Sequence, residues 1–257
     1  MKKLTKLFVL LVMIFSSHLV LSACGDKDII VSGKPGYPPV SWGQNGELTG
    51  LGYTVVKGLI THKAVVKTRV LPWKRVLVMA EQGMIDVVVG IRETPERSKH
   101  LAFIHTPLIE VSQNVFYMKG TIIKSKSDLK TKKGGFISGT VFNAEFAEYA
   151  KNNLTLSSVD TLEQNLKKLE YGRIQYFISP LLPTIHYINK NHMDIDIAFM
   201  AEPLFTTIEK IAISKASPCV TLLDAMDKAL QAMHQQDFIY QQFDLLTVKW
   251  DVLKYLN

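Results

Sequence analysis

The chain has 257 residues, of which 47% are hydrophobic, so it can form one or two domains with substantial cores. Its net charge is +7, but no dense run of lysine and arginine and no interleaving of basic and aromatic residues indicates nucleic-acid binding. The sequence also lacks the motifs of P-loop nucleotide sites, serine hydrolases, zinc proteases and Cys/His metal centres. We therefore expect no nucleic-acid partner, no metal, no cofactor and no catalytic activity.

The first 23 residues are typical of a secretory signal. Lys2, Lys3 and Lys6 form a positive n-region, and residues 7–21 are almost wholly apolar. That run is short for a permanent membrane span, which needs about 20 residues. Removing the signal takes away three lysines and no acidic residue, so the mature net charge falls from +7 to a mild +4.

Residues 21–24 read Leu-Ser-Ala-Cys and resemble a bacterial lipobox, in which the cysteine is acylated and becomes the mature N-terminus. On this resemblance we expect lipidation of Cys24. The alternative is ordinary signal-peptidase cleavage, which Leu21 disfavours because small residues are preferred three positions before the cut. With Cys24 assigned to lipid, Cys219 has no partner, so we expect no disulfide and interpret Cys219 as a small buried thiol.

The first expected elements are a strand over residues 28–33 and a proline-rich loop over residues 36–42. The loop has too many prolines to pair in a sheet. It carries Tyr37 and Trp42, each of which either faces a ligand or plugs the edge of the core, and Tyr37 is the better ligand candidate. A glycine-rich turn and an apolar segment then lead to a second strand over residues 65–71.

Residues 72–91 predict a helix followed by a buried strand. Pro72 suits the first turn of this helix, and Gly83 suits its end. Between them, apolar residues recur at helical spacing and form one stripe: Trp73, Val76, Leu77 and Ala80. Residues 85–91 contain three consecutive valines, which is typical of a parallel strand buried on both faces. Asp86 opens this strand, and we interpret it as a structural hydrogen-bonding residue.

Residues 94–97 predict the start of another helix. Thr94 suits its cap, the next two residues suit its first turn, and Arg97 would lie there too. Ligands of open α/β sheets gather beyond the carboxyl ends of the strands. A guanidinium beside free backbone N–H groups favours an anion such as a carboxylate. Arg92, five residues earlier, is either a second anion contact or part of a salt bridge at the rim.

A second lobe is indicated by a weak internal repeat. The pattern from Gly83 to Val89 recurs from Gly172 to Ile178, 89 residues later, and each copy follows an amphipathic helix. Such a repeat predicts two similar α/β lobes. Extended segments at residues 111–118 and 208–214 would carry the chain between them as a two-crossing hinge. We therefore expect lobe 1 to comprise residues 28–115 and 210–257, and lobe 2 to comprise residues 116–209.

Two further segments complete the expected lobes. Residues 134–138 form a short strand in lobe 2, and Gly139 and Thr140 open a helix, with Thr140 as its cap. In lobe 1, a long helix over residues 218–235 precedes an aromatic-rich tail that would cover that lobe: Phe238, Tyr240, Phe243, Trp250 and Tyr255.

The order of these motifs resembles the family-3 extracytoplasmic solute-binding proteins, which include receptors of ABC importers for polar amino acids. The likeness rests on Gly-Met-Ile-Asp with three valines, on Gly90, on Thr-Pro-Glu-Arg, and on Pro-Trp-Lys-Arg, which resembles a branch with mostly unassigned ligands. It implies a type II periplasmic-binding fold, whose two lobes close over a small anionic or polar metabolite. It also implies a monomer at the cell surface or in the periplasm, lipid-anchored through Cys24, that serves an ABC permease.

The resemblance further implies a set of ligand contacts. Arg97 would be the main anion contact, and Gly139 with Thr140 would offer backbone N–H and hydroxyl groups to the same carboxylate. Trp73 is either a wall of the site or a core residue on its helical stripe. The expected ligand-binding residues are Tyr37, Trp73, Gly90, Arg92, Arg97, Gly139, Thr140 and Ser179.

Amino-acid receptors of this family place an Asp after the second lobe's Gly-Arg-x-Asp strand, where it pairs with the ligand's ammonium. Here Gln175 replaces the first Asp, and Ser179 and Pro180 occupy the positions of the ammonium partner. An enclosed ammonium without a counter-charge costs several kcal/mol. We therefore predict that the ligand is not an ordinary zwitterionic α-amino acid, unless Glu145 or Glu110 replaces the missing partner.

Two other functions stay open on the same scaffold. The fold also resembles periplasmic cyclohexadienyl dehydratase, so an enzyme is one alternative. The other is a module that presents ligand to a separate membrane kinase. Fold alone does not decide among these functions.

Overall fold

The structure is a computed structural model that describes Cys24, residues 28–60, residues 65–247 and Tyr255. The chain divides into two compact units. Unit 1 holds the described residues up to Ile109 together with Glu209–Thr247, and unit 2 holds Glu110–Ile208 and Tyr255. The chain passes between the units inside two long strands, β8 (Ile109–Met118) and β13 (Phe205–Ser214), which contain the two extended segments expected as crossings. In the described part of the chain, no helix combines the length and apolarity needed to cross a membrane.

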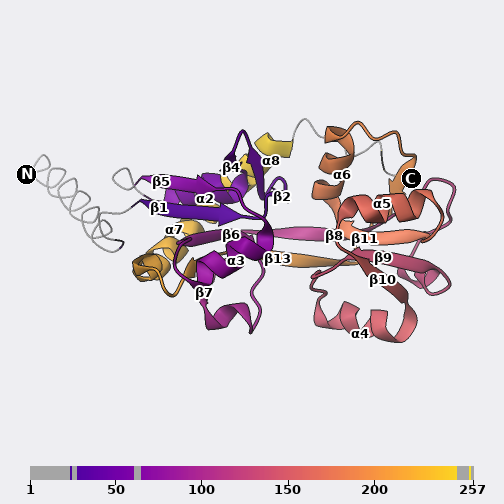
Figure 1. Ribbon diagram of the computed structural model, residues 1–257, viewed down its shortest axis with the longest axis horizontal. Helices are drawn as coiled ribbons and strands as arrows, with labels where there is room; N and C mark the ends of the chain where they lie inside the picture. Colours follow the sequence, from indigo (N-terminus) through magenta and orange to yellow (C-terminus); the bar gives the residue numbers. More distant parts are fainter. Residues whose placement is uncertain (1–23, 25–27, 61–64, 248–254, 256–257) are drawn as a thin grey trace, which may run out of the picture. The chain divides into compact units, whose positions relative to one another are not determined.

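Unit 1 is built on a mixed sheet in the order β5-β1-β6-β13 (Figure 1). The strands β5 (Val66–Arg69), β1 (Ile29–Gly33) and β6 (Val87–Ile91) are parallel, whereas β13 runs antiparallel to β6 and to β7 (Leu101–Phe103). The helices and short 3₁₀ turns of this unit are α2 (Leu51–Leu59), α3 (Trp73–Glu81), η1 (Arg97–Lys99), η3 (Pro218–Leu222), α7 (Leu223–Gln235) and α8 (Phe238–Thr247).

The strand β6 is buried along its whole length, as the three valines predict. Val88 packs in a cluster with Val76 and Ala80 of α3, whereas Val89 faces Gly52 of α2, where an added Cβ would lie 2.6 Å from the valine Cβ. Helices therefore cover β6 on both faces. A strand without a solvent-facing side must be apolar at every position.

A small second sheet corrects one expectation. The proline-rich segment forms a hairpin of β2 (Gly36–Tyr37) and β3 (Ser41–Gln44), which continues to β4 (Glu47–Thr49). Both prolines lie in the turn between the paired residues, so neither removes a hydrogen bond from the ladder. The interpretation of residues 36–42 as an unpaired loop was wrong for this reason.

Unit 2 is also built on a mixed sheet, in the strand order β10-β9-β11-β8. The strands β10 (Thr155–Val159), β9 (Lys133–Ile137) and β11 (Tyr176–Pro180) are parallel, and β8 and β12 (Ile197–Phe199) complete the sheet in antiparallel pairs. Its helices and 3₁₀ turn are η2 (Lys126–Leu129), α4 (Ala144–Asn153), α5 (Leu162–Glu170) and α6 (Leu181–Lys190).

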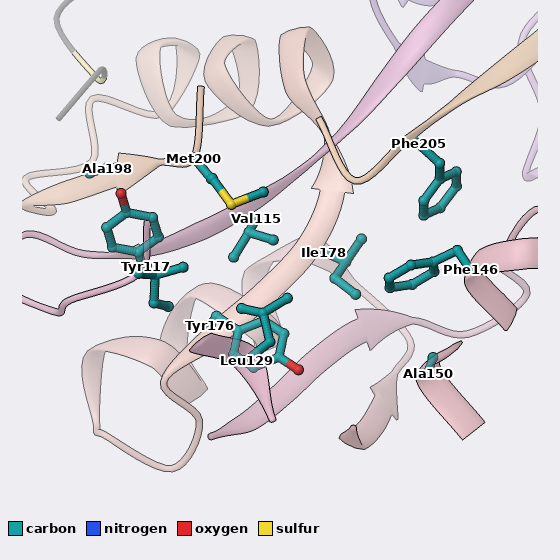
Figure 2. Close-up of a cluster of buried hydrophobic side chains, with 11 residues drawn as sticks. Val115, Tyr117, Leu129, Phe146, Ala150, Tyr176, Ile178, Ala198, Met200 and Phe205 are labelled. Atoms are coloured by element: carbon teal, nitrogen blue, oxygen red, sulfur yellow. The ribbon is translucent and has the colours of Figure 1, made fainter. Parts of the chain in front are cut away.

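Alternate residues of β11 enter different cores of unit 2. Tyr176 and Ile178 pack with Phe146 of α4, as Figure 2 shows. Phe177 packs on the opposite side with Leu166 of α5 and Ile185 of α6. Strand residues alternate between the two faces of a sheet, so this strand contributes to both apolar layers.

The internal repeat is present in the structure and has a local cause. Gly83 and Gly172 follow the C-cap residues of α3 and α5, and both adopt positive φ angles, 72° and 66°. In each copy the next residue donates its N–H to a carbonyl five residues earlier, from Met84 to Met79 and from Arg173 to Lys168. This helix ending needs the left-handed conformation that glycine adopts most easily.

Of the expected C-terminal tail, Phe238, Tyr240 and Phe243 lie in α8 of unit 1, but Tyr255 differs from the expectation. Tyr255 packs in a core cluster of unit 2 and donates from its hydroxyl to Asn189 Oδ1 at 2.6 Å, so it does not cover unit 1. Trp250, expected in the same tail, lies outside the described residues. A tyrosine with its ring in a core and its hydroxyl bonded satisfies both parts of the side chain.

The cysteines also differ from the expectation. Cys24 and Cys219 are joined by a disulfide in unit 1, with Cα atoms 4.4 Å apart, and both are buried. The expectation that Cys219 stands alone was therefore wrong. Their separation of 195 residues in sequence gives no sign of this proximity, because only the folded chain brings the two thiols together.

Two equivalent residues of the repeat, one in each unit, allow the stabilising effect of the same hydrogen bond to be compared. Asp86 and Gln175 hold equivalent positions, and their oxygens accept the backbone N–H groups of Ile30 in β1 and Lys133 in β9, both at 2.9 Å. Asp86 is buried and also accepts from the Ser217 hydroxyl, whereas Gln175 is half-buried. We expect Asp86→Ala to cost about 2–3 kcal/mol of unfolding free energy and Gln175→Ala about 1 kcal/mol, because buried unbonded donors are costly. Urea unfolding of the mature protein measures both, and equal losses would contradict this account.

Candidate functional site

Charged residues meet at the carboxyl edge of the unit 1 sheet. Lys34 follows β1 directly, and Arg92 follows β6 directly. These parallel strands are neighbours, so their carboxyl ends lie at the same edge. The part of β13 that belongs to unit 1 begins at Glu209. The residue after it, Lys210, pairs with Ile91 at the end of β6. Strand order and register therefore bring two cations and one carboxylate together.

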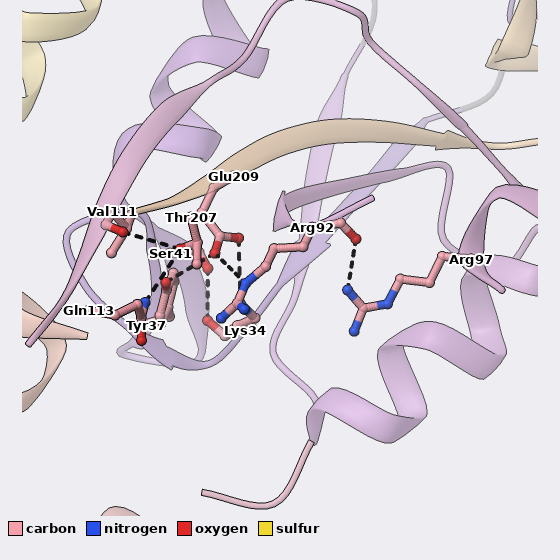
Figure 3. Close-up of polar contacts among 9 residues, drawn as sticks. All are labelled: Lys34, Tyr37, Ser41, Arg92, Arg97, Val111, Gln113, Thr207 and Glu209. Carbon is pink, nitrogen blue, oxygen red and sulfur yellow. Dashed lines mark hydrogen bonds and ion pairs between the residues drawn. The ribbon is translucent and has the colours of Figure 1, made fainter. Parts of the chain in front are cut away.

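The carboxylate of Glu209 is the centre of this cluster, as Figure 3 shows. It is fully buried, and its Oε1 accepts from the Tyr37 hydroxyl at 3.0 Å and from Arg92 Nε at 3.3 Å. Its Oε2 lies 3.5 Å from Lys34 Nζ. A buried carboxylate is tolerated when its lone pairs are filled by charged and polar donors.

Gly90 shapes the backbone that presents Arg92. It has a φ of 63°, and an added Cβ would lie 2.7 Å from a methyl group of Val40. Opposite it, the β13 register shifts between Lys210 and Ile211, which leaves a bulge in the ladder. A bulge redirects the residues beyond it, and glycine accepts the conformation that it requires. Gly90 thus has a structural role here, and its contact with ligand stays a prediction.

Arg97 lies beside this cluster, but the helix expected around it is only a short turn. The 3₁₀ helix η1 spans Arg97–Lys99, so a helix dipole contributes little to anion binding. The Thr94 hydroxyl accepts the Arg97 N–H at 3.3 Å, but the N-cap residue of η1 is Glu96, so the expectation that Thr94 caps this helix was wrong. The half-buried guanidinium donates from Nη1 to the Arg92 carbonyl at 2.8 Å. Among the described residues, no carboxylate lies within ion-pairing distance of Arg97.

Two aromatic residues named from the sequence flank the cations. Lys34 Nζ lies 4.0 Å from the ring centroid of Tyr37 and 5.7 Å from that of Trp73. The guanidinium carbon of Arg97 also lies 5.7 Å from the Trp73 ring. Trp73 also packs against the α3 core, so its core role is observed, whereas its role as a wall of the ligand site stays a prediction. Aromatic faces stabilise cations that have lost part of their hydration.

The cluster carries more positive than negative charge, and this excess affects the pKa values of its cations. Burial is the main cause that lowers the pKa of Lys34 to about 8; Glu209 opposes the shift, and Arg92 and Arg97 add to it. Burial and the neighbouring Arg92 also lower the pKa of Arg97. The four groups together carry three positive charges and one negative charge. A small anion would therefore be attracted to this edge of unit 1.

Lys34 and Glu209 were not among the residues expected from the sequence. Lys34 could have been found, because it directly follows the first strand, where ligand contacts of α/β sheets occur. Glu209 could not, since it lies between Ile208 and Lys210 in an extended segment and reads as an ordinary polar strand residue. Arg92 makes a salt bridge, as one interpretation held, but its partner is fully buried and not at a rim.

The residues expected in the second lobe lie at the carboxyl ends of two strands of unit 2. Gly139 and Thr140 follow β9, and Ser179 is near the end of β11. Thr140 does not cap α4, because Asn143 does so by accepting the Phe146 N–H at 2.8 Å. The buried Ser179 hydroxyl accepts from Thr184 at 2.9 Å. Ligand contacts at these residues stay predictions.

Metal chemistry receives no support from side-chain clustering. In residues 28–60 and 65–247, with Cys24 and Tyr255, no three His, Cys, Asp or Glu side chains are grouped in a way that could hold a metal ion.

The buried carboxylate gives a prediction with an adjacent control. We expect Glu209→Gln to destabilise the protein by about 3–5 kcal/mol, because it leaves clustered cations without their buried partner. Glu93 forms an ion pair with Lys210 at 2.8 Å, and its side chain is 46% exposed. Glu93→Gln should therefore cost less than about 1 kcal/mol. Urea unfolding compares the two variants, and similar losses would show that Glu209 does not hold the cluster together.

Comparison with known proteins places this architecture in a family. Residues 29–246 match the model of bacterial extracellular solute-binding proteins, family 3. The chain is 26% identical over 193 residues to the probable amino-acid-binding protein YxeM of Bacillus subtilis (strain 168), which covers 70% of this chain and 72% of that protein.

Solved structures show the same fold. A probable amino-acid ABC transporter extracellular-binding protein, YtmK of Bacillus subtilis, has a TM-score of 0.71 and 20% identity, and the match covers 87% of this chain and 98% of that chain. A histidine kinase sensor domain with similarity to periplasmic binding proteins has a TM-score of 0.68 and 20% identity, covering 87% and 96% of the two chains. The family match spans most of the sequence, and the two-lobe α/β fold agrees with it. The chain belongs to the bacterial extracellular solute-binding proteins of family 3.

Proposed function

We propose that this protein captures a small anionic or polar metabolite outside the cytoplasm, closes its two units on it and delivers it to an ABC importer. The observation that carries the proposal is the excess of positive charge around Lys34, Arg92 and Arg97 at the carboxyl edge of the unit 1 sheet. The half-buried guanidinium of Arg97, beside the Trp73 ring, suits a carboxylate. Closure is checked by small-angle scattering, in which a saturating ligand should reduce the radius of gyration.

Two alternatives use the same binding site differently. A separate membrane kinase could read the bound state, and the fold of a kinase sensor domain is similar, but a fold does not identify a partner. An enzyme would need a catalytic base, and Asp86 is the carboxylate that the sequence offers for that role. In the structure it is buried and accepts hydrogen bonds from a backbone N–H and a serine hydroxyl. YxeM and YtmK are both named as binding proteins, which favours binding without turnover.

The names of those relatives suggest an amino acid as ligand, whereas the residues of unit 2 argue against one. Gln175 is bonded to backbone groups, and Ser179 is bonded to Thr184. The side chain of Glu145 is 86% exposed and lies 3.7 Å from Lys126. None of these groups is placed as a buried counter-charge for an ammonium. We therefore propose an acid without an α-ammonium group.

Arg97→Ala tests the site. We expect it to weaken binding of small carboxylic acids by at least about tenfold, or ~1.4 kcal/mol, because it removes a charge-assisted contact. Lys99→Ala is the matched control, since Lys99 is exposed and pairs with Glu96 at 3.0 Å. Calorimetry gives the affinities, and thermal unfolding verifies the fold. Loss of stability without a change in affinity would instead make Arg97 a structural residue.

Paired ligands test the exclusion of amino acids. Each pair has one carbon skeleton with and without the ammonium, such as L-alanine with propionate and L-glutamate with glutarate. We expect the acid of at least one pair to bind at least about tenfold more tightly, because an enclosed ammonium without a counter-charge is costly. Low-micromolar binding of any common L-amino acid would overturn this part of the proposal.

The fate of Cys24 decides how the exported protein is held. A sulfur atom in a disulfide cannot also carry a lipid thioether, and both cysteines are buried. We expect the wild type to be soluble and its mass to rise by two hydrogens on reduction, and Cys219→Ser to lower stability by about 2–4 kcal/mol. The lipid anchor is the alternative outcome. It would appear as an acylated, membrane-bound protein that Cys24→Ser releases and Cys219→Ser does not.

A further inference from the structure

The cations of the unit 1 site are bonded to two different acceptors, and each acceptor with its cations is called an anchor point. Lys34 and the Nε of Arg92 are tied to the carboxylate of Glu209, whereas Arg97 is tied to the neutral carbonyl of Arg92. The Trp73 ring lies 5.7 Å from both Lys34 Nζ and the Arg97 guanidinium carbon. Trp73 thus lies near two cationic groups that are bonded to different partners.

Glu209 balances only part of the local charge. It already interacts with three donors from three different segments: Lys34, Tyr37 and Arg92. The charged groups that act on Lys34 are this carboxylate, Arg92 and Arg97, so the group of four has a net charge of +2. One carboxylate from a ligand would leave one positive charge without compensation in a largely buried setting, and two carboxylates would neutralise it.

We propose that this site binds a small dicarboxylate, with one carboxylate on Arg97 and the other on Lys34 and Arg92. The inference rests on the proposed function and narrows its ligand class. Two carboxylates on a short carbon chain match two anchor points better than a single phosphate group, whose charged oxygens are all bonded to one phosphorus atom. The Trp73 face would pack on the carbon chain that joins the two carboxylates.

Calorimetry with matched acids tests this assignment on the mature protein. The probes are the diacids from malonate to adipate, each paired with the monoacid of the same carbon number. We expect the best diacid to bind at least about tenfold more tightly than its monoacid. Lys34→Met should remove most of this ratio, and Lys34→Arg should retain it. Lys74→Met, at an exposed position of α3, is the control that should keep the wild-type ratio.

The pH dependence gives a readout that a merely structural lysine would not produce. Lys34 is faced by Glu209, Arg92 and Arg97, and by the rings of Tyr37 and Trp73, and its pKa is about 8. Carboxylic acids are fully ionised well below that value. The diacid-to-monoacid ratio should therefore fall as pH rises through about 8 in the wild type, and it should be flat in Lys34→Met.

Each result separates the inference from the function on which it rests. Monoacids that bind as tightly as their diacids would overturn the dicarboxylate and leave the anion receptor standing. A phosphate monoester such as glycerol phosphate that binds more tightly than every diacid would do the same. If none of these anions binds the folded protein, the proposed function fails, and the dicarboxylate fails with it.

Discussion

The buried carboxylate of Glu209 is the interaction on which the candidate site depends. It joins the segment after β1, the hairpin that carries Tyr37 and the segment after β6 to the first residue of unit 1 in β13. Without it, two neighbouring cations would repel each other at a partly buried edge. With it, they are held close together while positive charge remains in excess.

The scaffold places this carboxylate by simple geometry. Parallel pairing of β1 and β6 puts Lys34 and Arg92 at one edge, and the antiparallel β13 begins its unit 1 portion at the same edge. The bulge at Gly90 turns the chain before Arg92. These main-chain constraints of strand order, register and one glycine fix where Lys34, Arg92 and Glu209 meet.

The two units use the same backbone devices but differ in the chemistry at their strand ends. Positive-φ glycines end the helices before β6 and β11, and a side-chain oxygen, from Asp86 or Gln175, accepts a backbone N–H in each copy. At the strand ends, unit 1 gathers charged side chains, whereas unit 2 presents Gly139, Thr140 and Ser179. The repeated parts therefore build the fold, and the differing strand ends carry the selectivity that we propose.

The sequence alone determined the fold class, the helix and buried strand around residues 73–91, the repeat and the family, because these depend on local periodicity, glycine conformations and motif order. It also indicated Tyr37, Trp73, Arg92 and Arg97, which the structure brings together in unit 1. Only the tertiary structure showed that Glu209 and Lys34 complete that group and that Cys24 meets Cys219. Each of these contacts joins residues that are far apart in the sequence and that only the folded arrangement of strands and loops brings together. Such proximity is a property of the folded chain and leaves no periodic signal in the sequence.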